Sequence, residues 1–186
     1  MTSRADIERH LYRAITGNRL GAKTYRPELA IRALSRHARP WEKAGVSRET
    51  WRRWSNGSQA VSARSYRGLM AAYRRDRLST AREAQIRQGK ISITAHDNYD
   101  RQTREIGSAS LQWTPQSGNR LVDAYIRDGI DGAREAFYDG IGSDFFREWL
   151  HPDANDSDQS FTVKRLTFAE DQDGRRVGRR GNRRRR

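Results

Sequence analysis

Apolar side chains recur every three or four residues through residues 27–77, a spacing that predicts helices with one buried face. The first helix is expected over 27–39, because Pro27 suits a first helical turn. A second proline opens a short helix over 40–43, and Gly45 supplies the left-handed turn that ends it. The pattern rests on five apolar positions in the first helix: Leu29, Ala30, Ala33, Leu34 and Ala38.

The next two helices complete this basic half of the chain. Ser47 is a good N-cap for a helix over 48–55, in which Trp51 and Trp54 face inward. A further helix is expected over 62–77. The order of a helix, a short helix, a glycine turn, an arginine-bearing helix and a support helix is typical of a helix-turn-helix.

Alternating apolar and polar residues follow in the second half. They predict two short strands, over 91–95 and 109–113, on either side of a polar loop over 97–108. A last strand is expected over 161–168, where the alternation slips at Lys164 and Arg165 and so indicates a bulge.

Helical spacing returns between these strands. One helix is expected after Gly118 and ends at Gly129. A second runs over 130–149, with a bend at its internal glycines. The predicted fold class is therefore α+β, with an N-terminal helix-turn-helix domain followed by a small strand-strand-helix-helix-strand module.

Charge divides the chain in the same places. Residues 1–90 hold 21 Lys or Arg and 7 Asp or Glu, whereas residues 91–173 hold 8 and 16. Residues 174–186 add 8 arginines and no acid. We expect a basic DNA-binding domain over 1–90, with the helix-turn-helix at about 27–77, an acidic α+β module over 91–170, and a disordered arginine-rich tail over 171–186.

Composition narrows the function classes. The whole chain of 186 residues carries a net charge of +14, so a polyanion, with nucleic acid the leading candidate, is the expected partner. There is no cysteine, which excludes disulfides and thiolate sites. No apolar stretch approaches the roughly 20 residues that span a bilayer. We therefore expect a cytoplasmic protein without a membrane partner.

The helix over 48–55 carries the expected DNA contacts. Its first turns are where a recognition helix presents side chains to base edges. Positive charge continues at the end of the following helix, where contacts to the DNA backbone are expected. The predicted DNA-binding residues are Arg48, Glu49, Arg52, Arg53, Arg74, Arg75 and Arg77.

Enzyme chemistry has little support in the residues. The four histidines stand alone, which does not favour a metal site, and no phosphate-binding glycine loop or paired catalytic carboxylates can be nominated. We expect no enzymatic activity, no metal and no cofactor. The polar loop does offer the hydroxyls of Thr103, Ser108 and Ser110, for which turn formation is the ordinary interpretation.

Three segments carry a resemblance to a known family. They are GVSRETWRRWSNG from Gly45, ISITAHDNYDRQTREIG from Ile91 and FTVKRLTF from Phe161, within a likeness that spans roughly residues 40–170. In order and spacing the chain resembles the terminal proteins of linear actinobacterial chromosomes and plasmids. The resemblance implies a helix-turn-helix protein of the bacterial nucleoid that binds the telomeric single-stranded or duplex end. Such a protein primes DNA synthesis and stays covalently attached to the 5′ end.

The resemblance also implies partners and an attachment residue. A replicative DNA polymerase and a telomere-associated DNA-binding protein are the implied partners. The polymerase directs a hydroxyl of the terminal protein onto the α-phosphate of a nucleotide, so the terminal protein needs no catalytic residue of its own. Thr103 best matches the family's priming threonine, with Ser108 and Ser110 as substitutes, while Arg101 and Arg104 are candidates to hold the triphosphate.

Two alternatives from other classes stay open. One is a helix-turn-helix transcriptional regulator or plasmid replication or partition protein, for which a homodimer and a palindromic site are expected. The other is an architectural or RNA-binding basic protein, whose binding ignores sequence and depends steeply on salt.

Overall fold

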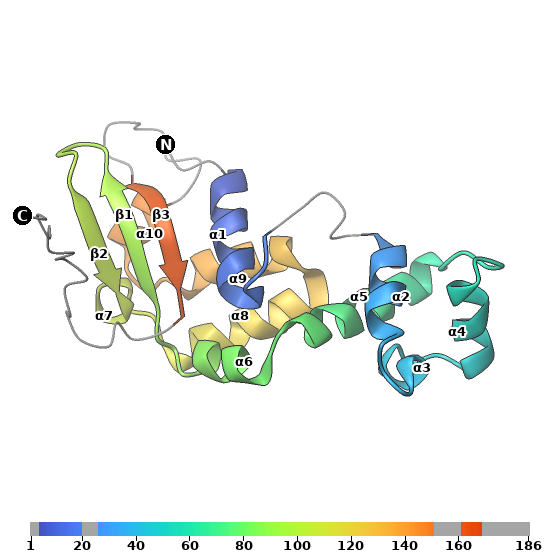
Figure 1. The fold of residues 1–186 in the computed structure, drawn as a ribbon. Coiled ribbons are helices and arrows are strands. Elements are labelled where there is room, and N and C mark those ends of the chain that lie inside the picture. The colour runs from blue at the N-terminus through green and yellow to red at the C-terminus, as the bar shows by residue number, and fades with distance from the viewer. Residues whose placement is uncertain (1–3, 20–25, 151–160, 169–186) are drawn as a thin grey trace, which may run out of the picture.

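The computed structural model describes residues 4–19, 26–150 and 161–168. It combines helices with one three-stranded antiparallel sheet, which confirms the α+β class in outline. Figure 1 shows an elongated molecule, with the sheet at one end, α2, α3 and α4 at the other, and α5 running between them. The helices are α1 (Arg4–Thr16), α2 (Pro27–Leu34), α3 (Pro40–Lys43), α4 (Arg48–Ser55), α5 (Ala63–Arg77), α6 (Thr80–Arg87), α7 (Ser108–Leu111), α8 (Pro115–Asp128), α9 (Ile130–Gly140) and α10 (Asp144–Leu150).

The three strands are β1 (Ser92–Asp97), β2 (Thr103–Gly107) and β3 (Phe161–Thr167), in the order β2-β1-β3. The central strand alternates as predicted, since Ile93 and Ala95 are fully buried. In the β1–β3 pairing the register shifts between Thr94 and Ala95, which leaves Lys164 as the extra residue of β3. The bulge predicted in the last strand is confirmed.

The second predicted strand is wrong. Residues 108–111 form α7, and the strand that pairs with β1 is β2, inside the segment predicted to be a loop. The apolar residues that suggested a strand, Leu111 and Trp113, are both buried, but a left-handed Gln112 (φ 53°) separates them. β2 has little apolar patterning because Ile106 is its only apolar residue, and Ile106 is also its only buried side chain. The observed module also contains more helices than the predicted order of two strands, two helices and a strand.

The predicted helix over 130–149 is interrupted. α9 ends at Gly140 and α10 begins at Asp144. Between them, the amides of Gly142 and Ser143 donate to the carbonyl of Leu111, at 3.0 and 3.3 Å, instead of to a preceding helical turn. These two bonds attach the segment to α7 and separate the two helices.

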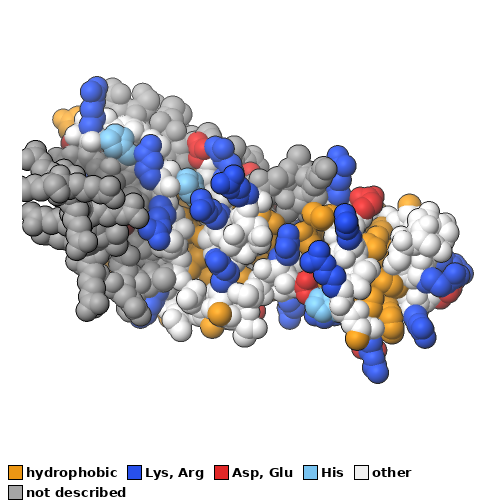
Figure 2. Space-filling model, viewed as in Figure 1, with side chains coloured by type: hydrophobic (Ala, Val, Ile, Leu, Met, Phe, Trp, Pro, Cys, Tyr) orange, Lys and Arg blue, Asp and Glu red, His pale blue; other side chains and the backbone are white. Residues whose placement is uncertain are grey.

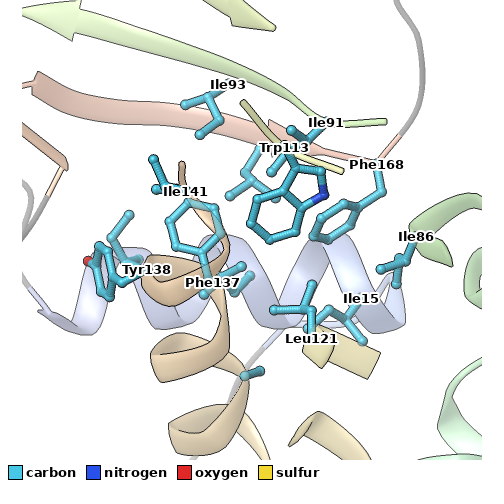
Figure 3. Close-up of a cluster of buried hydrophobic side chains, with 14 of the residues drawn as sticks. Ile15, Ile86, Ile91, Ile93, Trp113, Leu121, Phe137, Tyr138, Ile141 and Phe168 are labelled. Atoms are coloured by element: carbon cyan, nitrogen blue, oxygen red, sulfur yellow. The ribbon is translucent and has the colours of Figure 1, made fainter. Parts of the chain in front are cut away.

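Two separate hydrophobic cores organise the chain. The main core joins α1, α6, α8 and α9 with the inner face of the sheet. Figure 3 shows Phe137 beside Trp113 at its centre, with Ile93 from the sheet above and Leu121 from α8 below. The second, which we call the Trp core, consists of Ala30, Leu34, Ala44, Trp51, Trp54, Leu69, Met70 and Tyr73.

The boundary between the two cores does not lie at residue 90, where charge placed the domain boundary. α1 contributes Ile7, Leu11 and Ile15 to the main core, and α6 contributes Ile86. The buried residues of the Trp core all lie within residues 27–73. The basic first half of the sequence therefore supplies two helices to the same core as the acidic second half. The tail over 171–186 lies outside the described residues.

Direct backbone contacts connect the helices around the main core. A Cβ atom added at Gly118 of α8 would lie 2.0 Å from the carbonyl oxygen of Ile86 in α6, so only glycine allows this approach. Arg74 of α5 donates from Nη1 to the carbonyls of Ile126 and Arg127, at 3.1 and 2.8 Å. These carbonyls belong to the last turn of α8, where a cation is favourable. Arg74 thus ties α5 to the main core.

Candidate nucleic-acid interface

Local signals position α4 at the end of the molecule. Gly45 adopts a φ of +66°, which supplies the left-handed turn after α3. The Ser47 hydroxyl accepts a hydrogen bond from the amide of Thr50 at 3.1 Å, capping α4. The predicted bounds of α3 and α4 are confirmed, and α5 begins one residue later than predicted because Ser62 is its N-cap. α2 is five residues shorter than predicted, ending at Leu34 instead of residue 39.

The inner side of α4 holds the helix on the Trp core. Trp51 and Trp54 are 6% and 5% exposed, and their ring centroids lie 6.3 Å apart. Both side chains belong to the Trp core together with residues of α2 and α5, so the interpretation of these tryptophans as core residues is confirmed. Neither ring presents a face on which a base could stack.

The outer side of α4 is an exposed charged cluster. We call the group of Glu49, Arg52 and Arg53 the arginine fork. Arg52 donates to both carboxylate oxygens of Glu49, at 2.9 Å each, and Arg53 donates through Nε at 3.0 Å. The two terminal amino groups of Arg53 take no part in this bond. Nearby, the Arg48 guanidinium lies over the Trp41 ring, 5.4 Å from its centroid.

Glu49 has a specific physical role in this cluster. Hydrogen bonds from Arg52 and then Arg53 lower the pKa of Glu49 to about 2. The carboxylate is therefore charged at every pH at which DNA binding is measured. It accepts hydrogen bonds from both arginines, and side chains that are ordered before a ligand arrives lose less entropy on binding.

The charge state of Glu49 can be checked by titration. When folding lowers the pKa of a carboxyl group, that group adds to the free energy of unfolding at pH values above its ordinary pKa. This contribution is lost as the pH falls through the folded-state pKa. The Glu49 carboxyl should therefore titrate near pH 2 in a carbon NMR experiment. Arg52→Ala should raise its pKa toward the ordinary value of about 4.3. Arg48→Ala is the matched control, because Arg48 contacts Trp41 instead, and an ordinary pKa in the unsubstituted protein would contradict the fork.

The three arginines predicted at the end of α5 have different surroundings. Arg74 is half-buried and bound to α8 carbonyls, which favours a structural role over the expected DNA contact. Arg77 lies over the Tyr73 ring, 5.6 Å from its centroid, and donates to its hydroxyl at 3.2 Å. Arg75 is exposed. Two further exposed arginines, Arg64 and Arg67, lie one turn apart at the start of α5, and sequence analysis missed them although their spacing of three was visible.

The three candidate hydroxyls are not equivalent. Ser108 accepts from the amide of Ile91 at 2.7 Å and donates to its carbonyl at 3.2 Å, so its hydroxyl joins α7 to the start of β1. Thr103 is exposed at the first position of β2, where it pairs with His96 across the ladder, instead of in a loop. Ser110 is exposed on α7.

An open groove adjoins Ser110. Its volume is about 550 Å³, and Phe145, Phe146, Trp149 and Phe161 provide its apolar lining. Arg104 also lines it, but this side chain donates to Asp97 at 3.0 Å and pairs with Asp100. The Arg104 guanidinium, which was expected to hold a triphosphate, is therefore already paired with two carboxylates. Arg101 is exposed at the hairpin turn, with a φ of 58°.

Two other kinds of feature, a metal-ligand cluster and a membrane-spanning helix, are absent from the part of the chain that the structure describes. There, no three His, Asp or Glu side chains gather as metal ligands. The same residues include no helix that is both long enough and apolar enough to cross a membrane. No protein-family model, curated protein or solved structure matches the chain. The resemblance to terminal proteins therefore stays a prediction.

Proposed function

We propose that this chain is a DNA-binding protein in which α2, α3, α4 and α5 act as a helix-turn-helix and α4 is the recognition helix. The observation that carries the proposal is the arginine fork. It is exposed on the outer side of an N-capped helix whose inner side is fixed by Trp51 and Trp54. A capped helix that presents arginines beyond a tight turn is the geometry with which such proteins enter the major groove.

Guanidinium groups suit this role chemically. Arginine binds the O6 and N7 atoms of guanine through two donors, and it binds phosphate oxygens with the same planar group. Glu49 belongs to the interface through the orientation that it gives to Arg52 and Arg53. Sequence preference is therefore expected to include guanine.

Selection from a library of random duplexes tests this function. The full chain should enrich a common motif after several rounds, and the enriched duplex should bind more tightly than its scrambled counterpart. If every duplex binds equally, the architectural alternative replaces the proposal. Tighter binding to structured RNA than to any duplex would also overturn it.

Protein priming is a second candidate function, favoured by one observation. The Thr103 and Ser110 hydroxyls are both exposed, and Ser110 borders the open aromatic groove. In this reaction the hydroxyl oxygen would form a bond to the α-phosphate of a deoxynucleoside triphosphate, and pyrophosphate would leave. A partner polymerase would supply the metal ions and accept the proton. A telomere-associated DNA-binding protein and a location in the bacterial nucleoid belong to the same proposal.

Mass spectrometry distinguishes this candidate from a regulator. Protein recovered from the DNA of its native host, after exhaustive nuclease digestion, should carry a nucleotide monophosphate on the peptide with Thr103 or Ser110. Entirely unmodified protein, in cells whose replicon ends have been mapped, would leave the regulator as the function. A stable dimer on a palindromic site would support that regulator.

A further inference from the structure

A second basic cluster lies far from α4, where α1, α6 and β3 meet. These elements enclose a groove of about 720 Å³, which we call the basic groove. His10 and Arg13 line it from α1, Arg82 from α6, and Lys164 and Arg165 from β3. Sequence analysis did not group these side chains because they come from three separate segments of the chain.

The fold builds the groove from an open sheet edge. β3 is an edge strand of the described sheet, and α1 packs against it. The bulge at Lys164 leaves Lys164 and Arg165 as consecutive exposed side chains. On the opposite wall, Arg82 donates from Nη1 to the carbonyl of Ala14 at 3.0 Å, which fixes its guanidinium at the end of α1.

The charge of the groove has one sign. Among the described residues that line it, none is acidic. Burial lowers the pKa of His10, so at neutral pH the charge comes from the two arginines on the helices and the two cations on β3. Figure 2 shows Lys and Arg side chains gathered over α1 and β3, and more of them across the same face toward α2 and α4.

Protection of the sheet edge does not account for this cluster. Charged side chains and a bulge on an edge strand do prevent pairing with another chain, and Lys164 and Arg165 serve that purpose. Arg13 and Arg82, however, lie on helices and have no strand to protect. Four cations that line one groove give it a positive potential that attracts an anion.

We propose that the basic groove binds the phosphate backbone of DNA, as a second contact separate from α4. It rests on the proposed function only in that the ligand is DNA. Phe168 is the only Phe, Tyr or Trp among the described lining residues, and it is buried, so the groove offers no exposed face of these rings on which bases could stack. Contacts to phosphate alone carry no sequence information but add affinity and salt dependence.

Paired substitutions in the full chain test the proposal. The groove variant is Lys164→Gln with Arg165→Gln, and the control is Arg120→Gln with Arg127→Gln on α8, where both side chains are also exposed. Both variants lower the net charge by the same amount. Binding of a labelled random duplex is measured by fluorescence anisotropy from about 50 to 200 mM salt. The slope of log K against log salt should fall by about 1 for each cation that no longer binds a phosphate, or about 2 in the groove variant.

The outcomes separate this proposal from the function of α4. The groove variant should weaken binding to selected and random duplexes by the same factor, leaving their ratio unchanged. A salt slope equal to that of the control would overturn the proposal, whatever α4 does. The proposal would also be overturned if the groove variant lost binding of labelled dATP while its salt slope for duplex binding stayed unchanged. The groove would then be a mononucleotide site. Equal melting temperatures of the two variants show that the comparison is between folded proteins.

Discussion

Replacing Arg52 and Arg53 by alanine should weaken binding to a selected duplex by roughly 1–3 kcal/mol for each arginine that reads a base. Both side chains are exposed and contribute nothing to the Trp core, so the variant should fold normally. The measurement is the ratio of affinities for the selected and scrambled duplexes. Direct base contacts are made only to the selected duplex, whereas phosphate contacts are made to both duplexes. The ratio should therefore fall, because the variant loses the base contacts.

The two substitutions are not expected to be additive. Both arginines share the Glu49 carboxylate, so removal of one changes the orientation of the other. Each single variant, the double variant and Glu49→Gln form a set that measures this coupling. Glu49→Gln removes a negative charge, and it should therefore tighten binding to random duplexes while lowering the selected-to-scrambled ratio.

Arg120→Ala with Arg127→Ala is the matched control for the double variant. These exposed side chains lie on α8, and their replacement removes the same charge. If the control and the α4 variant lower both affinities equally, α4 contributes charge and no sequence reading. The proposal that α4 is a recognition helix would then be wrong, although the helices predicted for this unit are present.

Prediction from sequence succeeded where the signals were local. Gly45 and Ser47 fix the start of α4 through a turn and a cap, and both act within a few residues of their own position. The Ser62 cap of α5 is of the same kind. Short-range hydrogen bonds and backbone preferences determine these features, so the residues that carry them can be read without the rest of the fold.

Prediction failed where distant segments decide the structure. The strand expected at Leu111 and Trp113 is wrong because both side chains enter the main core from a helix and the residues after it. α1 and α6 received no assignment, although Ile7, Leu11 and Ile15 of α1 recur at helical spacing. The basic groove depends on three such segments, and its residues become neighbours only through the packing of α1 on β3.

The second large effect concerns the main core. Phe137→Ala should destabilise the folded chain by about 3–5 kcal/mol, the usual cost of removing a fully buried phenyl ring. Phe137 is 0% exposed and its ring lies 5.7 Å from Trp113 and 5.4 Å from Tyr138, centroid to centroid. The melting temperature should fall by about 2–4 °C for each kcal/mol. Phe145→Ala, at a side chain that is 49% exposed, should cost much less.

The same variant shows how strongly the two cores depend on one another. Circular dichroism follows the whole chain, and affinity for the selected duplex follows the α4 surface. Arg74 and α5 join the cores, but no buried residue of the Trp core belongs to the main core. Phe137→Ala should therefore keep nearly normal sequence selectivity at temperatures where it stays folded. As the temperature rises, the affinity of the basic groove for random duplex DNA should fall before the selectivity does, because the groove is built on α1 and β3 of the main core. Loss of selectivity at such temperatures would mean that the main core positions α4. In that case Phe137→Leu should show an intermediate loss, because it leaves a smaller cavity.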